Sequence, residues 1–123
     1  MNNSKHALPR IGIEKAPEPT WEIYTVDDVF MKQMPFLKAG YIVKQHSHDY
    51  DHGTLVACGA VRVWVDEKFV GDFYAPTCIT IEAGKLHTIM SLEDNTLAYC
   101  IHNVMRNGEV EITSHYLSDI KES

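Results

Sequence analysis

The chain has 123 residues, of which 45% are hydrophobic and 23% are charged, as in one ordinary globular domain and unlike a disordered segment. Eleven lysines and arginines against 17 aspartates and glutamates give a net charge of −6, which argues against a nucleic-acid partner because phosphates favour a basic surface. No apolar run approaches the roughly 20 residues of a membrane-spanning helix. The N-terminal residues lack the pattern of a signal peptide, so we expect a cytoplasmic protein with no membrane partner.

The first predicted unit is an extended arm over residues 1–20, because three of the five prolines fall there. Only Thr25–Met31 is predicted as a helical turn. The remaining segments are short and rich in β-forming residues. They predict strands at 21–25, 33–38, 40–46, 53–58, 60–66, 68–74, 77–82, 86–91, 96–102 and 109–117.

Turn-forming residues separate these predicted strands, and Asn107-Gly108 between apolar segments predicts a β-hairpin. Within residues 60–66, three valines alternate with Arg62 and Trp64, which predicts a strand with two different faces. The cysteines Cys58, Cys78 and Cys100 lie in apolar segments and are expected to pack in the core. Many short strands without intervening helices predict an all-β domain, a sandwich or closed barrel, over residues 21–118, with a C-terminal tail at 119–123.

Three of the seven histidines fall within seven residues, at His46, His48 and His52. On a strand, His46 and His48 would share one face, and His52 could open the next strand and return to the same place. His87 begins a later strand, and imidazole is the commonest metal ligand in proteins. These four histidines are candidate ligands of one divalent metal ion. The alternative is a polar loop that faces the solvent.

The glycines around these histidines favour the metal site over the loop. The segment Gly40-x5-His46-x-His48-x3-His52-x6-Gly59 resembles the first motif of the cupin superfamily. It departs from that motif at one position, where His52 replaces the usual glutamate.

The second cupin motif is matched in part. Gly84-x2-His87 fits it, whereas Pro76, Glu82 and Ser91 replace its first glycine, its proline and its asparagine. The resemblance covers residues 36–103 and implies a single-domain cupin, which is a double-stranded β-helix or jelly-roll barrel. It places the metal ligand in the second motif at His87.

With histidine at position 52, the chain resembles the four-histidine subset of small cupins. This resemblance implies one divalent transition metal per chain: Mn, Fe, Ni, Co, Cu or Zn. Four neutral imidazoles would leave the ion its full +2 charge, which favours an anionic small-molecule substrate. These metals all accept imidazole, so the sequence does not choose among them.

Strand parity predicts an apolar pocket beside the metal, suited to a small organic substrate. Tyr50 could donate a hydrogen bond to a bound anion, although it could equally be a tyrosine at the rim. His102 could support the site or carry a proton, provided that its face of the strand points inward. The predicted pocket residues are Thr54, Val56, Ile89 and either Tyr99 or Ile101.

The leading functional hypothesis is a metal-dependent oxidoreductase, specifically a dioxygenase that acts on a small enolisable or unsaturated compound. One alternative is a non-redox lyase or isomerase, in which the ion only polarises a carbonyl. Another is a module that binds a small ligand through its metal without turnover. The resemblance to small cupins also implies a homodimer, in which the proline-rich arm lies across the partner chain.

Overall fold

A computed structural model of the chain describes residues 7–8, 15–46, 51–103, 105–106 and 109–110. These residues form eleven strands, whose positions confirm the predicted all-β class. The strands are β1 (Glu22–Val26), β2 (Val29–Phe36), β3 (Ile42–His46), β4 (His52–Cys58), β5 (Ala60–Val65), β6 (Lys68–Tyr74), β7 (Thr77–Ile81), β8 (His87–Ser91), β9 (Thr96–Asn103), β10 (Met105–Arg106) and β11 (Glu109–Val110).

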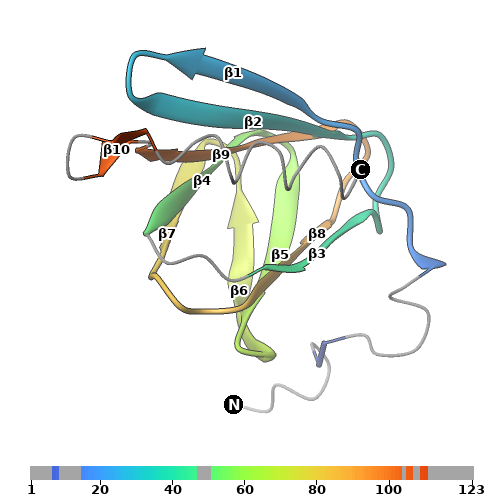
Figure 1. Cartoon of the computed structure of the whole chain (residues 1–123). Coiled ribbons are helices and arrows are strands. Elements are labelled where there is room, and N and C mark those ends of the chain that lie inside the picture. The colour runs from blue at the N-terminus through green and yellow to red at the C-terminus, as the bar shows by residue number, and fades with distance from the viewer. Residues whose placement is uncertain (1–6, 9–14, 47–50, 104, 107–108, 111–123) are drawn as a thin grey trace.

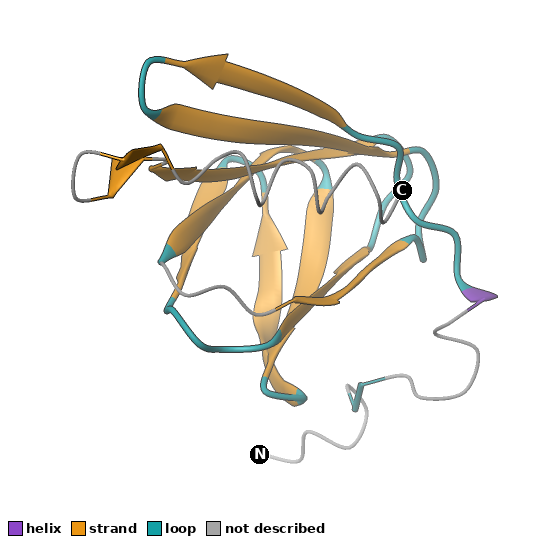
Figure 2. Ribbon diagram, viewed as in Figure 1, coloured by secondary structure: helices purple, strands orange, loops and turns teal. Residues whose placement is uncertain are grey.

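The strands form two large antiparallel sheets that face each other around one interior (Figures 1 and 2). The five-stranded sheet has the order β1-β2-β9-β4-β7, and the four-stranded sheet has the order β3-β8-β5-β6. Consecutive strands repeatedly change sheet, as in a jelly roll. No helix in the described part of the chain is long and apolar enough to cross a membrane.

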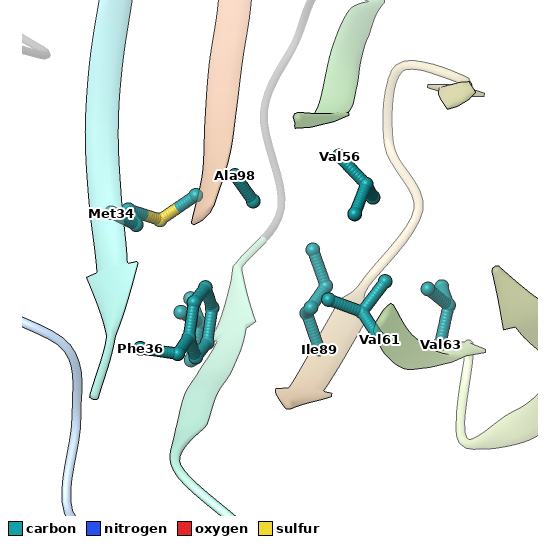
Figure 3. Close-up of a cluster of buried hydrophobic side chains, with 8 residues drawn as sticks. Met34, Phe36, Val56, Val61, Val63, Ile89 and Ala98 are labelled. Atoms are coloured by element: carbon teal, nitrogen blue, oxygen red, sulfur yellow. The ribbon is translucent and has the colours of Figure 1, made fainter. Parts of the chain in front are cut away.

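The core lies between the inner faces of the two sheets (Figure 3). Alternate residues along each strand point inward, so β2, β4 and β9 contribute one wall and β3, β5 and β8 contribute the other. Burial of these side chains holds the two sheets together. The buried cluster consists of Met34, Phe36, Val43, Val56, Val61, Val63, Ile89 and Ala98.

Strand β5 has the two faces that the valine alternation predicts. Val61 and Val63 are fully buried in the core, whereas Arg62 on the other face binds both carboxylate oxygens of Asp72 at 2.7 and 2.8 Å. These hydrogen bonds raise the pKa of the Arg62 guanidinium. Trp64 shares the outer face with Arg62 but is only 1% exposed, so this face of the sheet is also partly covered.

The helical turn predicted at Thr25–Met31 is wrong. Val26 ends β1 and Val29 begins β2, and the two residues are paired across a tight turn. Asp27 supplies the turn with a left-handed backbone, at φ 51°. Aspartate tolerates this conformation better than most side chains, which is why a short polar pair can reverse the chain here.

The hairpin predicted around Asn107-Gly108 is confirmed in its flanking strands, because β10 and β11 pair antiparallel. The two turn residues themselves lie outside the described residues, as do positions 111–117 of the predicted last strand and the tail at 119–123.

The described end of the arm contacts its own barrel. The Ile42 N–H donates to the Pro17 carbonyl at 2.9 Å, and Lys44 lies 3.5 Å from the Glu18 carboxylate. Pro17 and Glu18 therefore lie beside β3, which is an edge strand of the four-stranded sheet. This contact covers an edge that would otherwise offer unpaired backbone groups.

The cysteines were expected in the core, and this is wrong for two of them. Cys58 and Cys78 are exposed, whereas Cys100 packs against the core cluster. Cys78 is the partner of Leu55 across β4 and β7, on the outer face of that sheet. Apolar neighbours in the sequence do not determine which of the two faces a given residue occupies.

Candidate metal centre

Two of the four candidate ligands come together inside the barrel. His52 is the first residue of β4 and His87 is the first residue of β8, so the pair joins the two sheets. Both side chains are only 4% exposed. Their ring centroids are 4.7 Å apart, with 50° between the ring planes. Two distant parts of the sequence therefore bring their imidazoles into contact at one buried place.

Two aspartates hold the backbone beside these histidines. The Asp51 carboxylate, next to His52, accepts a hydrogen bond from the Ala83 N–H at 2.8 Å. The Asp66 carboxylate accepts from the N–H of Leu86, next to His87, at 3.0 Å, and the Leu86 carbonyl in turn accepts from the Asp66 N–H at 2.8 Å. These bonds fix where β4 and β8 begin. Neither anchor could be predicted from the sequence, because the two partners of each hydrogen bond lie 20 or more residues apart.

The other candidate ligands are placed less completely. The backbone register pairs His46 with His87 across β3 and β8, with an irregularity between Val43 and His46. His48 and Tyr50 lie outside the described residues. Among the side chains that the structure describes, no group of three or more histidines, cysteines, aspartates or glutamates gathers as a metal site. The four-histidine set therefore remains a prediction, of which the structure brings one pair together.

The geometry of this pair suits a shared divalent ion. Because metal–nitrogen bonds are about 2.1 Å long, two imidazoles that share an ion must lie next to each other, with their ligating nitrogens within about 4 Å. The observed separation of the His52 and His87 centroids is 4.7 Å. Their burial suits neutral imidazoles, which bind metals, better than charged imidazolium ions. The residues present thus fit a transition metal bound through nitrogen.

The predicted pocket residues divide into two groups. Thr54, Val56 and Ile89 are at most 1% exposed and lie on the inner faces of their strands, with Val56 and Ile89 in the core cluster itself. Tyr99 and Ile101 lie on the opposite face of β9, because they pair with Leu55 and Gly53 of β4. The prediction that either of them lines the pocket is wrong.

Cys100 and His102 occupy the inner-face positions of β9. Cys100 pairs with Thr54 and packs against the core. His102 is 7% exposed, and its ring stacks on Phe30 of β2 with centroids 4.4 Å apart and 21° between the planes. His102 therefore points inward, as its proposed supporting role requires, on the same face of the sheet as His52. Phe30 was not singled out in the sequence, since its contact with His102 depends on the pairing of β2 with β9.

The sequence matches no known family model and no curated protein. Its structure, by contrast, resembles solved cupins. A cupin superfamily protein from Desulfitobacterium hafniense is 19% identical, with a TM-score of 0.58, over 80% of this chain and 90% of that chain. The chain has the fold of these proteins, a double-stranded β-helix.

Two further cupin barrels resemble this structure. KdgF from Halomonas sp. is 18% identical, with a TM-score of 0.61, over 71% of this chain and 79% of that chain. An oxalate decarboxylase is also 18% identical, with a TM-score of 0.61, over 71% of this chain and 26% of that longer chain. Identities this low show the shared fold alone, so the function must be argued from the residues of the site.

Proposed function

We propose that this cupin is a metal-dependent oxidoreductase, specifically a dioxygenase that acts on a small enolisable or unsaturated compound. Its divalent ion would be held by His46, His48, His52 and His87. The observation that carries the proposal is the buried contact between the His52 and His87 rings, 4.7 Å apart. Two neutral imidazoles in contact at one buried place can donate their nitrogens to a shared divalent ion, for which imidazole is a common ligand.

Each proposed ligand is a neutral imidazole, so the ligand set leaves the ion its full positive charge. Such an ion would act as a strong Lewis acid. If it is redox-active, it would also allow electron transfer from the substrate to O₂. The histidines hold and orient the ion. The apolar side chains below them, among them Val56 and Ile89, exclude water from the interior. An anionic substrate with an enolate or carboxylate oxygen fits this combination of charge and apolar surroundings.

A non-redox lyase is the second candidate, and one observation favours it. One of the solved structures with the same fold is a decarboxylase, which is a lyase. The same histidines would then serve an ion that only polarises a carbonyl or carboxylate. Under this candidate, oxygen is not consumed.

An oxygen-uptake screen of the metal-loaded protein separates these candidates. Diketones, thiols and aryl alkenes are supplied in turn, with O₂ consumption and product formation both measured. We expect O₂ uptake in step with product, and loss of turnover under anaerobic conditions. Turnover that continues without oxygen would indicate the lyase, and binding of a compound without any turnover would indicate a ligand-binding module.

Substitutions of His52 test the ligand set. The variant His52→Glu should keep the metal but bind small anions more weakly, because the carboxylate lowers the net charge of the site by one unit. The variant His52→Ala should weaken metal binding by at least about 10- to 100-fold, since losing residues that merely support ligands already costs that much. Titration with metal, and then with acetohydroxamate, measures both effects. Equal metal affinity in the wild type and both variants would show that His52 is not a ligand.

We also propose that the chain forms a homodimer through the five-stranded sheet. Strand β1 is an edge of this sheet, and Tyr24 and Val26 on it are 44% and 60% exposed. An exposed edge strand offers unpaired backbone groups to another chain, and exposed apolar side chains mark interaction surfaces. Light scattering at micromolar concentration should give twice the mass of the chain, and Val26→Lys should lower it. A monomeric wild type would contradict this proposal.

A further inference from the structure

Among the residues that the structure describes, two buried threonine hydroxyls have no hydrogen-bond partner. The Oγ1 atoms of Thr54 and Thr88 are inaccessible to solvent and make no hydrogen bond, and the residues are 1% and 0% exposed. An unsatisfied buried hydroxyl is destabilising, and valine has almost the same shape without this penalty. The chain therefore keeps two polar atoms where an apolar residue would fold better.

The two threonine side chains point in opposite directions, Thr54 into the barrel and Thr88 out of it. Thr54 is two residues after His52 on β4, so both side chains point to the inner face. Its partners across the neighbouring strands are Cys100 and Ile79, both of which pack against the core. Thr88 lies between His87 and Ile89 and pairs with Trp64, so its side chain points to the outer face. Of the two hydroxyls, only the one on Thr54 faces the interior below the histidine pair.

We propose that the Thr54 hydroxyl binds an oxygen atom of the anion that occupies the metal centre. This inference rests on the proposed metal-binding function and deepens it. One position along the inner face of a strand is about 7 Å from the next, so a small ligand held at the histidines can extend down to the Thr54 layer. The hydroxyl donates its hydrogen to the ligand oxygen, and this bond supplies the partner that the free protein lacks.

This assignment restricts the ligand. The inner-face neighbours of Thr54 on the two adjacent strands are Ile79 and Cys100, so its hydroxyl is the one strong hydrogen-bond donor among these three side chains. The ligand that fits is a small oxyanion with two oxygen-bearing ends, one on the ion and one on Thr54. A purely hydrocarbon group at the second end would leave the hydroxyl unsatisfied, and the site would discriminate against it.

The test compares Thr54→Val with Thr88→Val, which remove the same group from opposite faces. Each protein is loaded with Co²⁺ and titrated with acetohydroxamate, while the visible spectrum of the ion reports binding. Both variants should keep one metal per chain and melt a few degrees higher than the wild type, because each loses an unsatisfied hydroxyl. Only Thr54→Val should bind the anion more weakly, by about 10-fold, as expected for a hydrogen bond to a charged group.

A third variant, Thr54→Ser, keeps the hydroxyl and loses the methyl group. It should retain the affinity for acetohydroxamate although its stability falls. The inference is overturned if Thr54→Val binds the anion as tightly as the wild type, or if Thr88→Val weakens binding equally. A wild-type protein that takes up no metal would instead contradict the proposed function itself, and metal content measured before the titration distinguishes these failures.

Discussion

The variant His87→Ala is expected to lose stoichiometric metal binding while its barrel stays folded. The His87 ring contacts the His52 ring, and the His87 backbone is paired in register with His46. Of the proposed ligands, His87 is therefore next to both of the others that the structure describes. The core is built from apolar side chains of both sheets and does not depend on an ion, unlike that of a zinc finger. Equilibrium dialysis against Co²⁺ measures the bound metal, and circular dichroism measures the fold.

The matched control for this variant is Lys85→Ala, two residues earlier in the chain. Lys85 is exposed, and its ammonium lies 3.5 Å from the Asp66 carboxylate, an ion pair of small energetic value. This control should bind metal like the wild type. If the metal-free wild type proved unfolded, the ion would be structural and the enzymatic proposal would lose its basis. If His87→Ala bound one metal as tightly as the control, His87 would not be a ligand.

The variant Gly59→Ala should destabilise the barrel by about 3–5 kcal/mol, the largest effect on stability that we expect from one added methyl group. Gly59 has φ 78°, a left-handed conformation that alanine adopts with strain. A Cβ there would overlap the Thr96 Oγ1 and lie 2.9 Å from the Thr96 Cα. The Thr96 hydroxyl cannot easily move aside, because it accepts a hydrogen bond from the Ala60 N–H and donates to the Glu93 carbonyl.

Gly40→Ala is the control that separates strain from overlap. Gly40 has φ 90°, but a Cβ there would have no atom within 4 Å. It should therefore cost only the backbone strain, about 1–2 kcal/mol. Urea denaturation of both variants gives the two free energies of unfolding. A similar loss in the two variants would show that the Thr96 contact is relieved by movement, contrary to this prediction.

The strands could be predicted from the sequence because their apolar alternation and turn residues are local signals. The prediction for 68–74 coincides with β6, and the other predicted strand boundaries before residue 104 lie at most four residues from the observed ones. The helical turn predicted at Thr25–Met31 was wrong because a two-residue turn between strands is too short to show the hydrophobic period of a helix or of a strand. Its outcome depended on Asp27 accepting a left-handed backbone.

The candidate site was predictable where a motif fixed the spacing, and less so elsewhere. His52 and His87 were found from the sequence because each opens a strand at a fixed distance from a glycine. Their contact and burial required the structure, as did the anchoring of their backbones by Asp51 and Asp66. Tyr99 was placed wrongly, since the inner face of β9 is set by its pairing with β4 and not by its own composition.

Metal analysis of the purified chain tests whether histidines of this barrel hold one divalent metal ion. Protein prepared without added metal is assayed by mass spectrometry for bound Mn, Fe, Co, Ni, Cu and Zn, and the metal-free form is then titrated with Co²⁺. We expect one equivalent of metal per chain, with an absorption spectrum typical of nitrogen ligands. Substitution of His52 and His87 together should abolish this binding. A chain that retains no metal and binds less than a tenth of an equivalent of Co²⁺ would contradict it.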